Sequence, residues 1–391
     1  MAQRGFVRKR GRTWTAYWHV EGAGGPRQRS KGGFLTRGEA QAHLTETLAA
    51  IHAGLFTEAN RITLGEYLLE RWLPSRKPAL RPSTYDSYLT NIRLHIVPAL
   101  GHIRLQQLTV DHLDRFYASQ LSDGNRRGAR AGLSPKTVRH LHTILHRVLR
   151  DAVRKNLVVR NVADAADPPK LRRPSEGIRT WTASQLREFL DATSDHPLGV
   201  VFLIAATTGM RRGEVLGLRW TDVDLDAARI AVRQTVLAVR YQVIVGSPKT
   251  ARGNRSIAID QITVEALRRL RSAHEVDALD ALVFGGPDGR PHHPDYVSQT
   301  FERTVARLGL PRIRLHDLRH THATLGLAAG IPTKVMSDRL GHATTAFTQD
   351  VYMHAIPPLE ADAAERIAAM IFATEAGDKA VTPAPTLRAD E

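Results

Sequence analysis

Residues 315–324, LHDLRHTHAT, set His316 and Arg319 three positions apart, about one turn of a helix. Upstream, TTGMRRGEVLGLRW (207–220) holds Arg211 and SPKTARGNRSIAI (247–259) holds Lys249. Downstream, LGHATTAFTQDVY (340–352) holds a further histidine and a tyrosine, His342 and Tyr352. Five cationic or titratable residues therefore precede one tyrosine in the second half of the chain.

The order of these residues points to one kind of chemistry. A phenol titrates near ~10 and is a poor nucleophile at neutral pH. Two guanidinium groups, an ammonium and two imidazoles can hold a phosphodiester and spread the charge that develops on it. The set predicts covalent attack of Tyr352 on a DNA phosphate.

The charge balance agrees with a polyanionic partner. The chain has 391 residues, 55 Lys and Arg against 39 Asp and Glu, and a formal net charge of +16. Such a chain is expected to bind nucleic acid. The alternatives are a basic surface that serves solubility and a ribosome-associated or RNA-binding protein.

Other compositional features exclude several classes. The chain has no cysteine, so disulfides, thiolate metal sites and a cysteine nucleophile are excluded. The N-terminus, MAQRGFVRKRGRTW, lacks the apolar core of a signal peptide, and no run of about 18 apolar residues spans a membrane. We expect a soluble protein of the cytoplasm, associated with the nucleoid.

Residues 1–57 are expected to form a small β-rich module. The run 13–20 (TWTAYWHV) is typical of a strand, 21–26 of a turn, 27–34 of a second strand and 37–52 of a helix. Basic residues are concentrated in residues 1–37, and a small basic sheet carrying Trp14 and Trp18 could lie in a DNA groove. The alternative is that the tryptophans form the core of the module.

Residues 62–165 are expected to form an all-helical domain. Thr63, Pro82 and Thr109 mark helix starts, and Ser134-Pro135 opens a helix with a continuous apolar stripe. Its other face carries Lys136 and Arg139, and is either a solvated face or a phosphate-facing one. Residues 167–176 (DPPKLRRPSE) are typical of a linker.

Residues 175–374 are expected to form a mixed α/β, mainly helical, domain, followed by a disordered tail over 375–391. Helices are predicted from a Thr182–Gln185 capping box to residue 192 and over 198–206, 261–274, 295–308, 318–329, 333–340 and 360–374. Strands are predicted over 229–239, 241–245 and 255–260. Trp220 is expected in the core, and Tyr241 and Tyr296 are expected to be structural.

Taken in order, these motifs resemble those of the tyrosine recombinase (phage integrase) family. The resemblance covers residues 175–370 and extends more loosely to the helical domain and the N-terminal module, which is similar to the arm-binding domain of large integrases. HxxR alone is a weak signal, whereas the ordered set is specific. The resemblance implies three domains, with the two larger ones closing around duplex DNA as a clamp.

The resemblance also implies a role for each motif residue. Arg211 and Arg319 would bind the scissile phosphate, Lys249 would protonate the departing 5′-hydroxyl, and His316 would exchange a proton with the tyrosine. His342 would donate a hydrogen bond to the phosphate and Tyr352 would form a 3′-phosphotyrosyl bond. Glu214 is expected to support the site. His320 and His322 are expected to be helix surface or packing residues.

No ATP, metal or other cofactor is expected, because the chain has no GxxxxGK[ST] loop and no carboxylate cluster suited to paired Mg²⁺. Further DNA contacts are expected from these basic residues: Arg8, Lys9, Arg10, Arg29, Lys136, Arg139, Arg252 and Arg255.

The family resemblance implies double-stranded attachment-site DNA as partner, a homotetramer on DNA, and accessory host and directionality factors. It implies no membrane partner. Donation of the segment after Tyr352 to a neighbouring protomer, or its packing on its own domain, would cover its apolar face. The rival interpretations are a type IB topoisomerase and a non-catalytic architectural DNA-binding protein.

Overall fold

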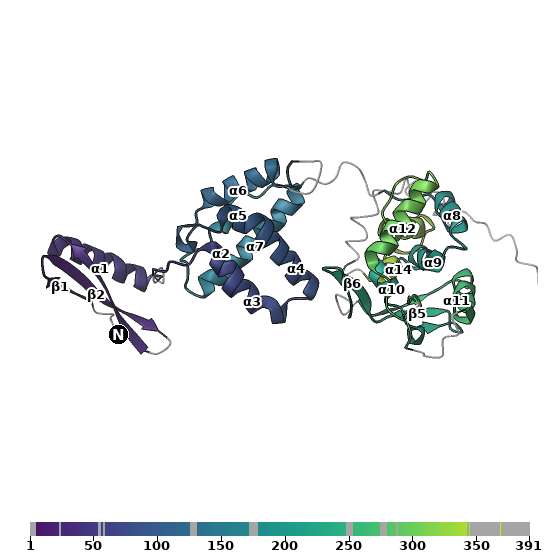
Figure 1. Cartoon of the computed structure of the whole chain (residues 1–391), viewed down its shortest axis with the longest axis horizontal. Helices are drawn as coiled ribbons and strands as arrows, with labels where there is room; N and C mark the ends of the chain where they lie inside the picture. Colours follow the sequence, from purple (N-terminus) through teal and green to yellow (C-terminus); the bar gives the residue numbers. More distant parts are fainter. Residues whose placement is uncertain are drawn as a thin grey trace, which may run out of the picture. The chain divides into compact units, whose positions relative to one another are not determined.

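The computed structural model describes residues 5–22, 25–53, 56–57, 59–125, 131–171, 179–247, 253–273, 280–286, 288–341, 344 and 368, and the structural statements below concern these. The chain divides into two units, Met1–Arg173 and Pro174–Glu391 (Figure 1). Among the described helices none has the length and apolar character needed to cross a bilayer. The predicted division into three domains and a tail stays a prediction.

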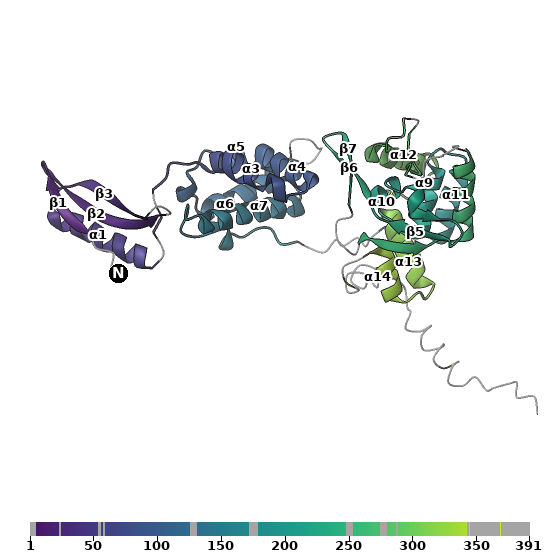
Figure 2. The same ribbon diagram turned by 90° about the horizontal axis from the view of Figure 1, so that it is seen from below.

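The first unit begins with a three-stranded antiparallel sheet in the order β1-β2-β3. Its strands are β1 (Phe6–Arg10), β2 (Thr13–Gly22) and β3 (Gly25–Phe34), and α1 (Arg37–His52) follows them (Figure 2). Thr36 and Glu39 form a capping box at the start of α1. Ala16, Trp18 and Leu44 form a small buried core between sheet and helix. The core role considered for the tryptophans is therefore confirmed for Trp18.

The helical part of the first unit begins at a capping box between Thr63 and Glu66. It contains α2 (Leu64–Glu66), α3 (Leu73–Arg76), α4 (Pro82–Asn91), α5 (Val97–Leu100), α6 (Val110–Asp123) and α7 (Pro135–Arg154). Two π-helical segments, Tyr67–Trp72 and Ile92–Ile96, join α2 to α3 and α4 to α5. The starts predicted at Thr63, Pro82, Thr109 and Ser134-Pro135 are confirmed.

The apolar stripe predicted on α7 is buried along its whole length. The stripe consists of Val138, Leu141, Leu145, Val148, Leu149 and Ala152. The helix also buries one carboxylate, Asp151, which accepts a hydrogen bond from Trp72 Nε1 at 2.8 Å and pairs with Arg76. A buried charge needs such partners to offset its desolvation. The stripe and this pair attach α7 to the α2–α3 segment.

The second unit combines helices with short antiparallel strands. Its helices are α8 (Ala183–Ala192), α9 (Gly199–Thr208), α10 (Arg212–Leu216), α11 (Gln261–Ala273), α12 (Pro294–Arg307), α13 (Asp317–Ala328) and α14 (Thr333–Leu340). β4 (Val223–Asp224), β5 (Arg229–Val232) and β8 (Arg255–Ala258) form one sheet in the order β4-β5-β8. β6 (Thr235–Val239) and β7 (Gln242–Gly246) form a separate hairpin.

Among the described residues of this unit, the predicted helices and strands agree with the structure to within about two residues, apart from one strand, and α10 and β4 were not predicted. The strand predicted over 229–239 is broken at Arg233 and Gln234, so that β5 joins the sheet and β6 joins the hairpin. Gln234 donates to the carbonyl of Gly217 at 2.7 Å, and this contact accompanies the break. The helix predicted over 360–374 and the tail 375–391 lie outside the described residues apart from residue 368.

The core of the second unit gathers the helices and the sheet into one hydrophobic cluster. α9 is apolar on nearly all sides, which is typical of a helix surrounded by protein. Trp181, Phe189, Phe202 and Phe301 pack with ring centroids 5.0–5.8 Å apart around one end of α9. Trp220 is buried, as predicted. The buried α9 thus supports the segment that follows it, which carries Arg211.

Candidate functional site

The turn after α9 places Arg211. Gly209 has φ +65°, a left-handed conformation that ends α9 and that a side chain adopts only with strain. A Cβ at this position would also lie 2.6 Å from Leu340 Cδ2 and 2.8 Å from His322 Cδ2. Arg211 follows as the N-cap of α10. The glycine therefore lets α13 and α14 approach the backbone directly beside the predicted catalytic arginine.

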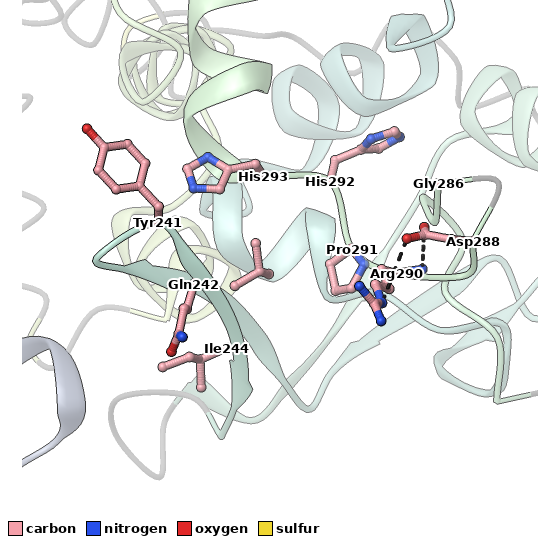
Figure 3. A pocket seen from close by; sticks show the side chains of 10 residues that line it. Tyr241, Gln242, Ile244, Gly286, Asp288, Arg290, Pro291, His292 and His293 are labelled. Carbon is pink, nitrogen blue, oxygen red and sulfur yellow. Dashed lines mark hydrogen bonds and ion pairs between the residues drawn. The ribbon is translucent and has the colours of Figure 1, made fainter.

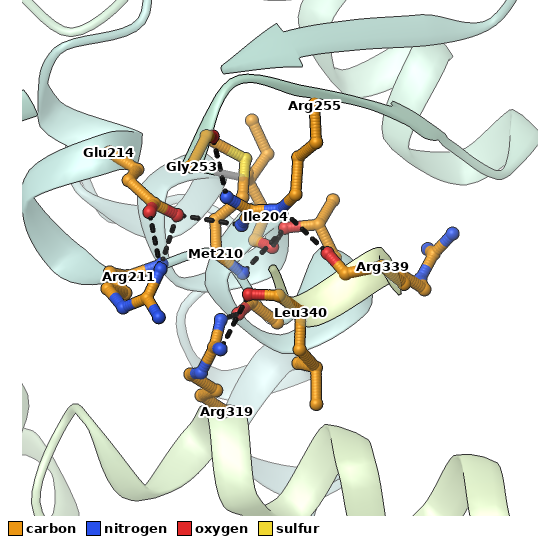
Figure 4. A network of polar contacts seen from close by, with 11 residues as sticks. Ile204, Met210, Arg211, Glu214, Gly253, Arg255, Arg319, Arg339 and Leu340 are labelled. Atoms are coloured by element: carbon orange, nitrogen blue, oxygen red, sulfur yellow. Dashed lines mark hydrogen bonds and ion pairs between the residues drawn. The ribbon is translucent and has the colours of Figure 1, made fainter. Parts of the chain in front are cut away.

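Glu214 holds Arg211 in place (Figure 4). Its Oε1 accepts from Arg211 Nη1 at 2.8 Å and its Oε2 accepts from the Arg211 backbone N–H at 3.0 Å. Burial by itself raises the pKa of this carboxyl group, but the hydrogen bonds and charges of Arg255 and Arg211 outweigh burial and lower it. Glu214 is therefore a buried anion that supports the site, as expected. The Arg211 side chain keeps 42% of its surface exposed.

Arg255, at the start of β8, is occupied within the protein. Its Nη2 donates to Glu214 Oε2 at 2.8 Å, its Nε to the carbonyl of Arg339 at 2.8 Å, and its Nη1 to the carbonyl of Gly253 at 3.2 Å. The side chain is only 7% exposed. These contacts favour a supporting role for Arg255 in this structure over the DNA contact expected from the sequence. Its DNA contact stays a prediction.

Arg319 lies in the first turn of α13 and is buried. Its Nη1 donates to the carbonyl of Gly209 and its Nη2 to the carbonyl of Leu340, both at 2.6 Å. Gly209 precedes Arg211 by two residues and Leu340 ends α14. The structure thus brings the predicted arginine pair to one junction of α9, α13 and α14.

His316 is the N-cap residue of α13 and keeps an exposed edge. Surrounding protein atoms desolvate its imidazole, and the charges of His320 and Arg319 act in the same direction, so that its pKa falls to about 4. The His316 ring packs edge to face against the His320 ring, with the ring centroids 5.4 Å apart. At neutral pH His316 is therefore neutral and able to accept a proton.

His322 and Arg339 contact each other, and this contact was not predicted from the sequence. His322 Nδ1 lies 2.9 Å from the carbonyl of Ala206, and Arg339 Nε lies 3.2 Å from His322 Nε2. The packing role expected for His322 is confirmed by these contacts. No local sequence signal identifies the pair, because the two residues are 17 positions apart and lie on different helices.

The remaining predicted catalytic residues, Lys249, His342 and Tyr352, lie outside the described residues, as does the predicted DNA contact Arg252. The described part of the predicted site consists of Arg211, His316 and Arg319. Across the described ranges, no group of three or more His, Asp or Glu side chains is arranged to hold a metal ion.

The basic residues predicted on the N-terminal sheet divide between its two faces. Arg8 and Arg10 pair with Thr15 and Thr13, on the face opposite the buried Trp18. Lys9 pairs with Trp14, and Arg29 pairs with Trp18, so both belong to the face that packs on α1. The exposed side chains of Arg8 and Arg10 are therefore better placed for a ligand on the open face of the sheet.

Lys136 and Arg139 lie together on the exposed side of α7. They are three positions apart, so they share one face of the helix. Arg139 Nη1 donates to the carbonyl of Pro169 at 3.3 Å. The structure leaves both residues on the surface, and their contact with DNA stays a prediction.

An open pocket of about 960 Å³ lies between the β6–β7 hairpin and a segment that contributes Gly286, Asp288 and residues 290–293 (Figure 3). Tyr241, at the turn of the hairpin, is 90% exposed and stacks on His293, with the two ring centroids 6.4 Å apart. Tyr241, which was expected to be structural, makes this stacking contact but takes no part in the core, and its backbone lies in a left-handed turn with φ +65°. Among the described residues that line this pocket, none belongs to the predicted catalytic set.

The second unit has the fold of a tyrosine recombinase catalytic domain, a mainly helical domain with a small antiparallel sheet. Three family descriptions match successive parts of the chain: the arm DNA-binding domain over 6–51, the phage integrase N-terminal SAM-like domain over 63–120, and the phage integrase family over 179–357. The chain belongs to the phage integrase family of tyrosine recombinases.

Curated relatives match most of the chain. A XerC-like tyrosine recombinase of Caldanaerobacter subterraneus subsp. tengcongensis is 27% identical over 85% of this chain and 89% of its own length. The ICEBs1 integrase of Bacillus subtilis is 26% identical over 77% and 81%.

Solved structures share the fold at lower identity. The Tn1549 transposon integrase bound to a circular intermediate DNA has a TM-score of 0.66 at 20% identity, over 78% of this chain and 99% of that one. A lambda integrase dimer bound to a core site has a TM-score of 0.56 at 17% identity, over 89% and 93%.

Proposed function

We propose that this chain is a site-specific DNA recombinase that integrates and excises a mobile element through a 3′-phosphotyrosyl intermediate. The convergence of Arg211 and Arg319 at the junction of Gly209 and Leu340 carries this proposal, together with membership of the integrase family. Arg211, with 42% of its side chain exposed, can donate to the non-bridging oxygens of a phosphate. Arg319 would add its fixed positive charge and the second N–H of each Nη, beyond the two that already donate to Gly209 and Leu340.

The proposed reaction is a transesterification. The Tyr352 oxygen attacks the scissile phosphorus, a bond forms between them, and the bond to the 5′-oxygen of the next nucleotide breaks. The tyrosyl proton passes to His316, and Lys249 gives a proton to the departing 5′-hydroxyl. Arg211, Arg319 and His342 stabilise the charge on the pentacoordinate phosphate. The phosphotyrosyl bond preserves the energy of the broken strand, so resealing needs no ATP.

The environment of His316 supports its place in this scheme. Its pKa of about 4 leaves the imidazole unprotonated at neutral pH in the DNA-free protein, so that it can receive the tyrosyl proton. Bound phosphate would raise this pKa, because a nearby anion favours the charged imidazolium. The same residue could then return the proton during resealing.

The remaining parts of the chain are proposed to bind DNA. The N-terminal module would bind arm-type sites through Arg8 and Arg10, and α7 would face the phosphates of the core site through Lys136 and Arg139. A tetramer would bring two DNA sites together. A lambda integrase, which shares the fold of this chain, has been solved as a tetramer bound to a Holliday junction. That structure supports the proposal of a tetramer for this chain.

Exchange between two DNA sites tests the proposal against its rivals. Two plasmids, carrying the two attachment sites of the element, are incubated with the protein, and recombinant junctions are measured by quantitative amplification. We expect junctions with wild type and none with Tyr352→Phe. A type IB topoisomerase would relax supercoils without forming junctions. An architectural protein would bind both DNAs equally with and without the Tyr352 hydroxyl.

A further inference from the structure

The C-terminal end of α14 is joined to the predicted arginine pair. The last carbonyl groups of a helix have no partner within the helix. Here the carbonyl of Leu340 accepts from Arg319 Nη2 at 2.6 Å, and the carbonyl of Arg339 accepts from Arg255 Nε at 2.8 Å. Arg255 in turn binds Glu214, which holds Arg211. The end of α14 therefore contacts Arg319 directly and Arg211 through two intermediates.

The side chain of Arg339 fixes this helix end to three other elements. Its Nη2 donates to the carbonyl of Thr207 at 3.0 Å, at the end of α9. Its Nη1 donates to the carbonyl of Ala258 at 2.9 Å, at the end of β8, and its Nε donates to His322 on α13 at 3.2 Å. One planar guanidinium thus holds α14 against the elements that carry or support Arg211 and Arg319.

The contact with His322 defines the protonation of that histidine. Arg339 can only donate, so Nε2 of His322 accepts and Nδ1 carries the proton that is donated to the carbonyl of Ala206. Burial and the charge of Arg339 lower the pKa of His322 to about 4, which is consistent with a neutral ring. His322 is thus an acceptor that orients Arg339.

We propose that Arg339, oriented by His322, is a positioning residue for DNA cleavage. It sets the position of the α14 end, and through it the guanidinium groups of Arg211 and Arg319. The inference rests on the proposed function. The chain also leads from Leu340 through Gly341 to His342 and Tyr352 in sequence. Errors of about 1 Å in such a site lower rates by about 10²-fold.

Removal of the guanidinium separates positioning from binding. Arg339→Met keeps an unbranched, largely apolar stem and removes every donor. We expect its equilibrium affinity for attachment-site DNA to stay within about twofold, whereas its first-order rate of covalent adduct formation on a nicked site at saturating DNA falls by about tenfold or more. Circular dichroism and thermal unfolding confirm that the variant is folded at the assay temperature.

Lys334→Met is the matched control. Lys334 lies on the same helix, is 71% exposed and pairs with Asp338, so its replacement removes one positive charge without touching the network. We expect its cleavage rate to equal that of wild type. Equal cleavage rates in folded Arg339→Met and wild type would overturn the inference.

A pair of variants at His322 keeps the inference testable if Arg339→Met does not fold. His322→Gln preserves an acceptor for Arg339, whereas His322→Leu removes it. We expect His322→Gln to cleave faster than His322→Leu at equal DNA occupancy, and equal rates in the two folded variants would contradict the role. Absence of adduct with DNA-bound wild type would instead refute the proposed function itself.

Discussion

At the scale of single residues, the arginines of the second unit divide into those that hold the structure and those that face outward. Arg255, Arg319 and Arg339 each donate to backbone carbonyl groups at the ends of helices or strands. Of the predicted pair Arg211 and Arg319, Arg211 has the more exposed side chain. A guanidinium suits both tasks, because it presents several donors in one plane and stays charged.

Loss of the Glu214 charge should lower the free energy of unfolding. Glu214→Gln leaves Arg255 buried without its anion, and breaking such a buried pair costs about 3 kcal/mol. Urea denaturation measures the loss, with Asp338→Asn as the exposed control, where we expect a change within about 0.5 kcal/mol. A Glu214→Gln protein as stable as the control would show that the pair contributes little.

Gly209 should tolerate no side chain. Gly209→Ala adds a Cβ 2.6 Å from Leu340 and 2.8 Å from His322 in a residue with φ +65°. Gly309 has φ +67° but open space around it, so Gly309→Ala isolates the conformational cost of about 1 kcal/mol. We expect Gly209→Ala to lose about 1–3 kcal/mol more, as is typical of overpacking. Equal losses in thermal or urea unfolding would argue against the tight junction.

Acidification should destabilise the DNA-free protein. Desolvation and neighbouring positive charges lower the pKa of His316 and of His322 from 6.5 to about 4. Between these pH values the unfolded chain binds more protons, so the free energy of unfolding falls as the pH falls from 6.5 towards 4. Well above pH 6.5 both rings are neutral in both states and contribute no slope.

Urea denaturation across this pH range measures the effect. His322→Leu removes the imidazole that contacts Ala206 and Arg339 and feels the charge of Arg319. In this variant the free energy of unfolding should depend less steeply on pH, by the equivalent of up to about one bound proton. The same slope in wild type and variant would mean that His322 titrates normally in the folded protein.

At the scale of elements, local signals predicted most helices and left out what depends on distant partners. The capping residues Thr63, Thr109, Ser134 and Thr182 mark real helix starts. β1 was not predicted, because FVRKR is largely exposed and charged and gains its strand form from pairing with β2. Patterns of period 3.6 also do not distinguish the π-helical segments from α-helix.

The candidate site was predictable in part for the same reason. The motifs name Arg211, His316 and Arg319, and the structure brings the two arginines to one junction. The residues that support this pair could not be predicted from the sequence, since Arg339 contacts Thr207 and Ala258, which are 132 and 81 residues away along the chain. Such contacts depend on the tertiary fold and carry no local pattern.

The exposed face of α7 should contribute to DNA affinity without sequence discrimination. Lys136→Ala removes one surface charge, and loss of one phosphate contact should lower the slope of log affinity against log salt concentration by about 0.9. Arg115→Ala on α6, where the arginine pairs with Asp111, removes the same charge from another surface and should leave the slope unchanged. Fluorescence anisotropy across a salt series measures both, and equal slopes in the two variants would remove α7 from the DNA interface.

At the scale of the whole molecule, the chain combines a small sheet module, a helical region and a mixed catalytic domain under a net charge of +16. The three family matches follow the same order along the sequence. Separate hydrophobic cores support the sheet module, the helical region and the second unit. The positive excess lies mainly in the first unit: residues 1–57 carry 9 Lys and Arg against 3 Asp and Glu, and residues 62–165 carry 17 against 8. Residues 175–374 are almost balanced, with 23 against 22, so a polyanion would be attracted chiefly to the sheet module and the helical region.

A nicked suicide substrate tests the central claim most directly. A duplex carrying the attachment site, labelled on its 3′-phosphate side, is incubated without ATP or metal with wild type or Tyr352→Phe, and binding is first shown by anisotropy. We predict a denaturation-resistant protein–DNA adduct with wild type and none with Tyr352→Phe. An adduct with both proteins would place the nucleophile elsewhere, and tight binding without any adduct would contradict the covalent mechanism.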